Sequence, residues 1–434
     1  MSDLAGLRHA VQTASIARVS GRLVQAVGSL LEAELPGVGV GTSCIVEPGV
    51  LCEVVGFRER RALLMPLEAT DGASFGSRVT VRDEAIMVNV GDGLLGRVID
   101  GLGRPIDGLP PLPALHRRPI YGGAPPAMKR APITRHIATG VKVLDGLLTL
   151  GCGQRIAITA GSGVGKSTLL GMLARNMQAD VNVVCLVGER GREVREFIDH
   201  SLGPAGLARS VVVVATSEQS PALQVKATFL ATTLAEYFRD QGKDVLLMMD
   251  SITRLALAQR QIGLSAGEPP TTRGYTPSVF SLLPRLLERA GNGVDRGSIT
   301  GVYTVLIEGD DIHDPIGDAV RGILDGHIVL SRKLASHGQF PAVQVLGSLS
   351  RLMDRVASPA HRAAATRVRD LMATYEENEE LIRLGAYRRG SSAQVDEAIE
   401  RLPRIKEFLK QDASKGFPFK EMLDQLERLA APPR

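Results

Sequence analysis

The sequence predicts an α/β protein in which a parallel sheet covered by helices follows a small N-terminal β-barrel and precedes a helical C-terminal domain. Three observations predict this fold class. A glycine-rich loop at residues 159–168 stands between a strand pattern and a helix pattern. Apolar runs alternate with helical stretches from about residue 140 to residue 355. Short strand-like runs precede this region, and helical spacing of apolar residues follows it.

Composition limits the class of protein. The chain has 434 residues, enough for about three domains at ~150 residues each, and 44% of them are hydrophobic. A net charge of +4 is too small to indicate a nucleic-acid or membrane partner, and 4% aromatic residues without Trp do not suit a base-stacking surface. The four cysteines form no Cys-x-x-Cys pair, and no apolar run could span a bilayer, so a cytoplasmic protein with free thiols is expected.

Residues 1–17 are expected to form a short amphipathic helix. Leu4, Leu7, Val11 and Ala14 recur at helical intervals, with polar residues between them. A lone helix of this length is only marginally stable in water, so its apolar stripe needs a partner. Docking on the same chain and docking on another protein both remain open.

Residues 18–90 are expected to form the barrel. Strand-like runs occur at residues 19–24, 43–46, 51–55 and 61–65, separated by turn residues such as those at 36–37 and 48–49. The barrel shows no catalytic constellation. Residues 91–139 then form a loop-rich connector, rich in proline and glycine, that belongs to a nucleotide-binding domain spanning residues 91–355.

The glycine-rich loop carries the strongest chemical signal. Glycines leave backbone N–H groups free to face an anion, and the next helix directs its positive dipole end to the same place. Lys166 would reach the β- and γ-phosphates, and the Ser167 hydroxyl would bind Mg²⁺. Ala160 replaces the usual first glycine of this motif. That position forms the turn and does not surround the phosphate. The expected nucleotide-binding residues are Gly161, Ser162, Gly163, Val164, Gly165, Lys166, Ser167 and Thr168.

Two carboxylates lie where strands of the predicted sheet end. Strands are expected at residues 181–187, 211–215, 244–250, 298–306 and 327–330, and ligands of parallel sheets lie beyond the carboxyl ends of the strands. Glu189 would accept a proton from the attacking water, and Asp250 would hold Mg²⁺ together with Ser167. The alternatives are a salt bridge from Glu189 to Arg190 or Arg192, and a strand-end cap for Asp250.

Residues 356–434 are expected to form a helical C-terminal domain. Val368, Leu371 and Tyr375 recur at helical spacing, and Gly385 marks a helix end. A further stripe runs from residue 419 to residue 429. Pro403 is expected to start or kink the helix between these two.

Taken together, several motifs resemble the export ATPases of type III secretion. They are residues 160–168 (AGSGVGKST), 188–194 (GERGREV), 246–254 (LLMMDSITR), 267–275 (GEPPTTRGY), 308–311 (EGDD) and 322–327 (GILDGH). The resemblance runs from about residue 18 to residue 410. Within the group, residues 338–343 (GQFPAV) and 385–392 (GAYRRGSS) are most similar to the flagellar enzyme, with the injectisome ATPase as the close alternative.

This family is similar to the catalytic subunit of rotary ATP synthases. The resemblance implies a RecA-like P-loop NTPase core, Mg²⁺-dependent hydrolysis of ATP that energises protein export, and a homohexamer with sites between neighbouring subunits. It places Lys166, Ser167, Glu189, Arg190, Asp250 and Arg254 on the γ-phosphate and metal side of the site. Phe340 matches the aromatic that stacks on adenine, and Arg351 matches the arginine finger that reaches the neighbouring site.

The resemblance also implies partners. The N-terminal helix would engage a stator-like regulatory protein, and the C-terminal helices would meet a central stalk, the export gate, chaperones and export substrates, at the periphery of the inner membrane. Two other classes remain open. A RecA-like RNA helicase would need a basic, aromatic barrel, whereas Phe57 and Phe75 are the only aromatics at residues 18–90. The second class is a non-catalytic or ATP-synthesising subunit of a rotary ATPase. A site that binds nucleotide without hydrolysing it would not need Glu189.

Overall fold

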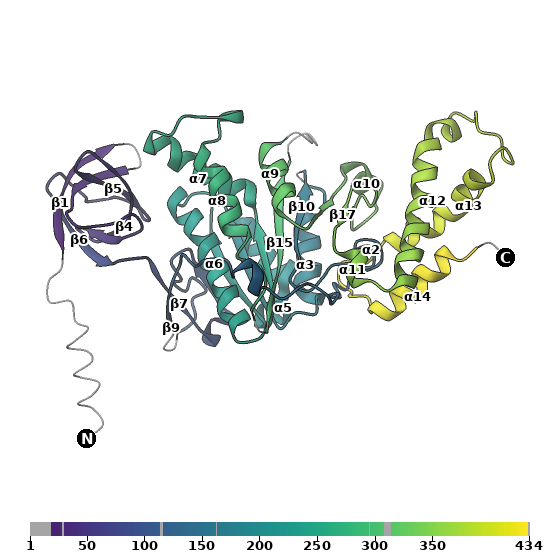
Figure 1. The fold of residues 1–434 in the computed structure, drawn as a ribbon, viewed down its shortest axis with the longest axis horizontal. Helices are drawn as coiled ribbons and strands as arrows, with labels where there is room; N and C mark the ends of the chain where they lie inside the picture. The colour runs from purple at the N-terminus through teal and green to yellow at the C-terminus, as the bar shows by residue number, and fades with distance from the viewer. Residues whose placement is uncertain are drawn as a thin grey trace, which may run out of the picture.

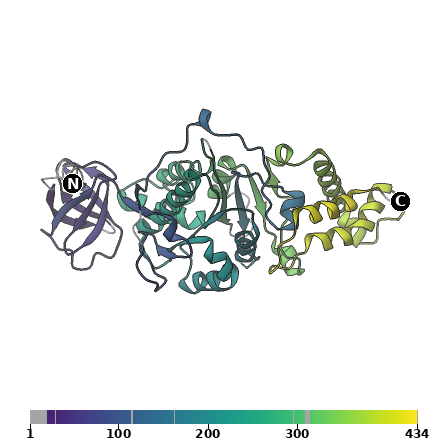
Figure 2. The same ribbon diagram turned by 90° about the horizontal axis from the view of Figure 1, so that it is seen from below.

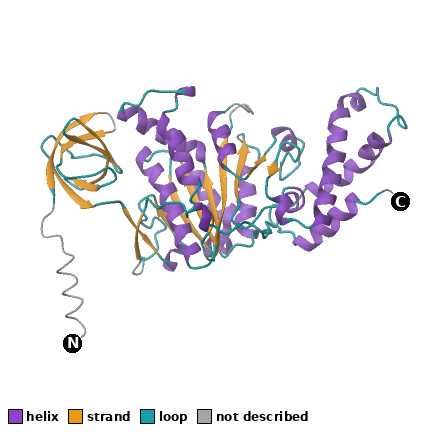
Figure 3. Ribbon diagram, viewed as in Figure 1, coloured by secondary structure: helices purple, strands orange, loops and turns teal. Residues whose placement is uncertain are grey.

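The computed structural model describes residues 19–27, 30–112, 116–161, 163–294, 296–307 and 314–432. Three parts follow one another along the long axis: an all-β part, an α/β core and a helical part at the C-terminal end (Figures 1 and 3). The expected N-terminal helix, Ser162 and residues 308–311 lie outside the described residues. The predicted fold class is confirmed in its three parts.

The N-terminal part is a closed six-stranded barrel, as predicted. Its strands lie in the order β1-β2-β5-β4-β3-β6, and every neighbouring pair is antiparallel. Their alternate side chains fill the interior with small and branched residues, among them Leu31, Val54 and Leu64. The strands are β1 (Ser20–Val27), β2 (Leu30–Glu34), β3 (Ser43–Val46), β4 (Val50–Arg58), β5 (Arg61–Pro66) and β6 (Arg78–Asp83).

The end of the predicted barrel and the predicted connector differ from expectation. Strand β7 (Met87–Val90) lies outside the barrel and pairs with β9 (His116–Pro119) of the connector. Strand β8 (Val98–Asp100), also in the connector, extends the main sheet by pairing in parallel with the strand at residues 210–215. Part of the connector therefore belongs to the main sheet. Its short strands lack the long apolar runs that mark the central ones.

The core is a nine-stranded sheet with the path order β17-β16-β10-β15-β13-β11-β12-β8 and β14 paired to β15. The central strands are parallel, and only β14 and β17 run antiparallel to their neighbours. All five predicted core strands are present. Besides β8, the strands are β10 (Arg155–Ala160), β11 (Val181–Val187), β12 (Ser210–Ala215), β13 (Asp244–Asp250), β14 (Gly291–Asn292), β15 (Ser298–Leu306), β16 (Gly326–Val329) and β17 (Leu349–Ser350).

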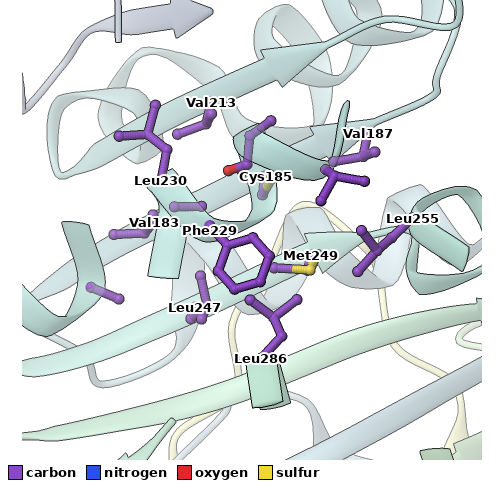
Figure 4. Packing of buried hydrophobic residues seen from close by; sticks show 14 of the residues in the cluster. Val183, Cys185, Val187, Val213, Phe229, Leu230, Leu247, Met249, Leu255 and Leu286 are labelled. Carbon is purple, nitrogen blue, oxygen red and sulfur yellow. Dashed lines mark hydrogen bonds between the residues drawn. The ribbon is translucent and has the colours of Figure 1, made fainter. Parts of the chain in front are cut away.

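Helices cover both faces of this sheet, and successive strand residues alternate between two cores. One core packs Val183, Cys185, Leu247 and Met249 against Phe229 of α6, as Figure 4 shows. The other packs the intervening strand residues against α2, α3 and the C-terminal helices. The helices of the core are α2 (Lys142–Leu147), α3 (Lys166–Asn176), α4 (Gly191–Glu196), α5 (Gly203–Ala208), α6 (Pro221–Asp240), α7 (Ile252–Ala266), α8 (Pro277–Leu287), α9 (Pro315–Ile323), α10 (Arg332–Ser336) and α11 (Met353–Val356), with the shorter turns η1 (Asp92–Leu94), η2 (Ala127–Lys129), η3 (Phe197–Leu202) and η4 (Thr272–Gly274).

The C-terminal part consists of α12 (Pro359–Arg383), α13 (Ala393–Leu409) and α14 (Phe419–Ala430), which pack on α2 (Figure 1). Gly385, with φ 70°, follows the end of α12 as predicted. Of the two expectations for Pro403, a helix start is wrong, because α13 begins ten residues earlier, where the Ser392 hydroxyl accepts a hydrogen bond from the Val395 N–H. Pro403 lies inside this helix, and a kink there stays a prediction. Within the part of the chain that the structure describes, no helix is long and apolar enough to cross a bilayer.

Candidate nucleotide-binding and catalytic site

The predicted strand, loop and helix around residues 159–168 are present. Strand β10 ends at Ala160, and α3 begins at Lys166. Gly163 (φ 76°) and Gly165 (φ 89°) adopt left-handed backbone conformations that a side chain would strain. Gly165 also caps α3, so the free N–H groups of the first helical turn and the helix dipole face the loop. The described part of the loop is thus shaped to bind an anion.

The two carboxylates predicted at strand ends meet Lys166 at this loop. Strands β11 and β13 are paired in parallel, with Leu186 opposite Asp250, so Glu189 and Asp250 leave the sheet at the same edge. The Lys166 Nζ lies 2.5 Å from Asp250 Oδ1 and 3.6 Å from Glu189 Oε1. All three side chains are at most 15% exposed. The tertiary structure therefore brings one cation and two carboxylates into a single buried cluster.

Glu189 has the environment of a general base. Its Oε1 is buried and has no hydrogen-bond partner among the described residues, so one lone pair is directed into the site unpaired. Burial raises the pKa of Glu189 to about 7, with Lys166 opposing the shift and a hydrogen bond with Glu193 adding to it. Among the described residues, neither Arg190 nor Arg192 forms the salt bridge to Glu189 that the sequence left open. Glu189 instead faces Lys166, and Arg190, which is 82% exposed, lies 4.0 Å from Glu193.

Asp250 is held by a residue that the sequence did not single out. The buried Thr304 hydroxyl, on the neighbouring strand β15, donates a hydrogen bond of 2.6 Å to Asp250 Oδ1. That oxygen therefore accepts both from Thr304 and from the Lys166 ammonium. A hydrogen bond to a charged group is stronger than a neutral one and fixes the carboxylate rotamer. Thr304 is one of two threonines in the buried strand β15, and only the pairing of β13 with β15 shows that it lies beside Asp250.

A cavity of about 210 Å³ lies beside the loop. It is lined by Ser167 and Thr168 of α3, by Asp250, and by Glu189, Glu193 and Glu196 on the chain that follows β11. Glu193 is the further residue that sequence analysis missed, although it stands within the quoted motif at residues 188–194. Its pKa is lowered, first by the hydrogen bond from Glu189, so the pair holds its proton on Glu189. The sequence did offer one indication, because Glu189 and Glu193 are four residues apart at the start of α4.

The same oxygen atoms could hold Mg²⁺. Hydroxyl and carboxylate oxygens are the ligands that this ion prefers, and Ser167, Asp250 and Glu193 all line one cavity. The unpaired Glu189 Oε1 within the cluster is consistent with a ligand or a water bound there. The donor set therefore fits a metal-bound triphosphate.

Other predicted residues are distributed around this cluster. The Arg254 side chain packs on Gly188, where an added Cβ would lie 2.8 Å from it, so Arg254 stands directly beside the start of the Glu189 turn. The Phe340 ring lies beside the loop, 3.5 Å from where a Cβ on Gly165 would be, and is 43% exposed. Both side chains therefore lie next to the site, and their roles stay predictions.

Arg351 is placed elsewhere. Its guanidinium donates hydrogen bonds of 3.3 Å to the carbonyl oxygens of Leu324 and Arg321, at the end of α9. Within the described residues it forms no hydrogen bond or ion pair with Lys166, Glu189 or Asp250. The chain therefore does not bring this arginine to its own catalytic cluster.

The parallel sheet, the loop with its lysine, and the carboxylates at adjacent strand ends define a P-loop nucleoside triphosphatase. Comparison with known proteins narrows this class. Residues 140–350 match the nucleotide-binding domain of the ATP synthase alpha/beta family, and residues 357–428 match the C-terminal domain of the T3SS EscN ATPase.

Curated relatives and solved structures agree. The chain is 51% identical to the flagellum-specific ATP synthase of Bacillus subtilis, with 94% of each chain covered. It is 51% identical to the type 3 secretion system ATPase of Xanthomonas euvesicatoria, over 97% of this chain and 96% of that protein. The structure of the assembled ATPase EscN from enteropathogenic E. coli superposes with a TM-score of 0.91 and 45% identity, covering 95% of this chain and 100% of EscN. The chain belongs to the family of type III secretion ATPases, and it hydrolyses ATP.

Proposed function

We propose that this protein energises protein export through the flagellar type III apparatus by Mg²⁺-dependent ATP hydrolysis. The observation that carries the chemistry is the buried cluster of Lys166, Glu189 and Asp250 at the phosphate loop. The flagellar assignment is supported by residues 338–343 and 385–392 and by relatives named flagellum-specific ATP synthase at 51% and 49% identity. The alternative is an injectisome, supported by type 3 secretion system ATPases at 51% and 50% identity.

Each residue of the cluster has a distinct role in this proposal. Lys166 and the N–H groups at the start of α3 bind the β- and γ-phosphates, and Arg190 and Arg254 approach the γ-phosphate from the Glu189 side. Glu189 accepts the proton of the attacking water. Ser167 and Asp250 would hold Mg²⁺, which would supply positive charge to the phosphate oxygens, and Thr304 fixes the orientation of Asp250. Phe340 stacks on the adenine.

The working form is proposed to be a homohexamer. Arg351 is bonded at the end of α9 and away from its own cluster, a position that suits a finger directed at a neighbouring subunit. EscN has been solved as an assembled ATPase and in complex with its central stalk EscO. We infer a central stalk here too, and, from the family, a stator-like regulatory protein, chaperones, export substrates and an export gate. The hexamer would then lie on the cytoplasmic side of the inner membrane.

The test is export in the native organism. A strain that carries Lys166→Ala should lose ATP-dependent export, and hook and filament proteins should vanish from the culture supernatant. Lys129→Ala, on the exposed connector, is a matched control that should export normally. Loss of needle or translocon proteins with flagellar export intact would transfer the assignment to an injectisome. Neighbouring genes for rod, hook and ring proteins would support the flagellar assignment independently.

A further inference from the structure

A second cavity, of about 420 Å³, lies between α2, α13 and α14, far along the chain from the phosphate loop. Figure 2 shows α2, in blue, beside the yellow C-terminal helices. We call it the C-terminal basic cavity. Its charged lining residues are Lys142, Arg404 and Arg428, with Glu407 as the single carboxylate.

The three cations of this cavity have no partner carboxylate. Among the described residues, no salt bridge involves Lys142, Arg404 or Arg428. The one hydrogen bond from the Arg428 side chain goes to a backbone carbonyl, that of Asp424, at 3.1 Å. By contrast, the nearby Arg401 is paired with Glu397 at 3.0 Å. Three cations and the single carboxylate Glu407 leave the cavity with an excess of positive charge.

Lys142 is held in place by aromatic rings. Its Nζ lies 5.6 Å from the centroid of Phe408 and 5.3 Å from that of Phe417. Its backbone N–H donates a hydrogen bond of 2.8 Å to the side-chain oxygen of Gln411. This bond joins the start of α2 to the loop after α13. Burial lowers the pKa of Lys142, with Glu407 opposing the shift, so an incoming anion would favour the charged ammonium. This cation is positioned before any ligand arrives.

The remaining wall decides what kind of anion fits. Phe408 and Leu429 form an apolar side next to the charges. Free phosphate would pair with the same cations, but it has no apolar part to place against Phe408 and Leu429. Nucleic acid binds along an extended stripe of cations, whereas the cations here are confined to one open depression. A ligand that carries an acidic side chain next to an aliphatic one matches both the cations and the apolar side of the cavity.

We propose that the C-terminal basic cavity binds an acidic, amphipathic protein segment, with carboxylates on Lys142, Arg404 and Arg428 and an apolar side chain on Leu429 and Phe408. The segment belongs to a partner protein. The surface lies outside the nucleotide cluster, so this proposal does not depend on the assigned catalytic roles.

Binding to the full chain can be measured by fluorescence anisotropy with a fluorescein-labelled helical peptide of Glu and Leu. The double variant Arg404→Glu/Arg428→Glu should weaken binding at least tenfold, because attraction becomes repulsion at two positions. Arg388→Glu/Arg389→Glu, which makes the same charge change on an exposed loop, is the matched control and should bind normally. A peptide with Gln in place of Glu should not bind. ATP turnover of both variants should equal that of the parent, which shows that they fold.

A photocrosslinker at Gln425, inside the cavity, should attach to the same peptide. Equal loss of binding in the two double variants, or crosslinks mapped to another site, would overturn the proposal in favour of diffuse charge attraction. Cavity-dependent binding of phosphatidylglycerol vesicles or of polyuridine, with no binding of the peptide, would also overturn it and would identify a membrane or RNA as the ligand.

Discussion

The ammonium of Lys166 lies 2.5 Å from Oδ1 of Asp250, although 84 residues separate them in the chain. The pair links the phosphate loop to the strand end expected to hold Mg²⁺. Nucleotide binding would replace this contact, because a triphosphate offers Lys166 a more negative partner while a metal ion takes up the charge of Asp250. Lys166 and Asp250 thus neutralise each other here, and in the nucleotide complex each would have a new partner of opposite charge.

Glu189→Gln should leave ATP binding nearly intact and lower kcat by about 10²–10⁴-fold, because the amide cannot accept a proton from water. Phosphate release and the binding of a fluorescent ATP analogue measure the two effects separately. Glu196→Gln, on the same cavity but exposed, is the control and should retain most activity. Parent-like turnover in the Glu189 variant would remove this residue from the mechanism.

The pH profile should show a deprotonation near neutrality. Burial raises the pKa of Glu189 to about 7, so the active carboxylate accumulates as pH rises, and kcat/KM should increase to a plateau above that value. Glu193 adds to this shift through its hydrogen bond and its charge. Glu193→Gln should therefore move the midpoint of the rise to lower pH, whereas Glu196→Gln should not. An unchanged midpoint would argue against coupling between Glu189 and Glu193.

Thr304→Val should weaken activation by Mg²⁺ about tenfold, since a hydrogen bond to a charged group contributes roughly 1.5 kcal/mol or more. A titration of ATPase activity with Mg²⁺ measures this effect, and Thr304→Ser should restore the parent curve. The control is Thr300→Val, on the same strand. It removes a hydrogen bond that the Thr300 hydroxyl accepts from the Gly153 N–H, and the Mg²⁺ curve should stay unchanged. A change in thermal stability without a change in the Mg²⁺ curve would make Thr304 purely structural.

Arg351→Ala should act on neighbouring subunits. If Arg351 completes the next site in a hexamer, its loss should cost a large part of the ~10³–10⁵ that such fingers contribute to the rate. In mixtures with parent chains, activity should then fall more steeply than the fraction of parent chain. The control is Arg355→Ala, an exposed arginine four residues further along the chain. In the same mixtures its chains should keep the activity of the parent chains. A strictly proportional decrease would show that each chain works alone.

Phe340→Ala should raise the KM for ATP about tenfold with a smaller effect on kcat, because aromatic stacking on a base contributes roughly 1–3 kcal/mol. Phe340→Tyr should restore the parent KM. Steady-state kinetics with ATP and with inorganic tripolyphosphate, which lacks a base, provide the comparison. An equal loss for both substrates would mean that Phe340 supports the loop through Gly165 and does not contact adenine.

Much of the molecule followed from local sequence patterns. Long apolar runs predicted the central strands, because a buried parallel strand needs a continuous run of such residues. Glycines followed by Lys166 and Ser167 predicted the phosphate loop, because its backbone conformations and its helix start are local properties. The motifs around them were dense enough to indicate the family. The prediction of Pro403 as a helix start failed because the Ser392 cap and the flanking residues favour a helix that runs through it.

Tertiary structure decided the rest, because those relationships depend on which strands pair. Thr304 faces Asp250 only because β13 and β15 are neighbours in one register, and β8 joins the sheet although its three residues carry little signal. Chain folding beyond β11 places Glu193 within hydrogen-bonding reach of Glu189. The sequence by itself determined which groups could serve the chemistry. Only the packed fold decided which of them share one cavity, since distances across a sheet are set by pairing and not by separation along the chain.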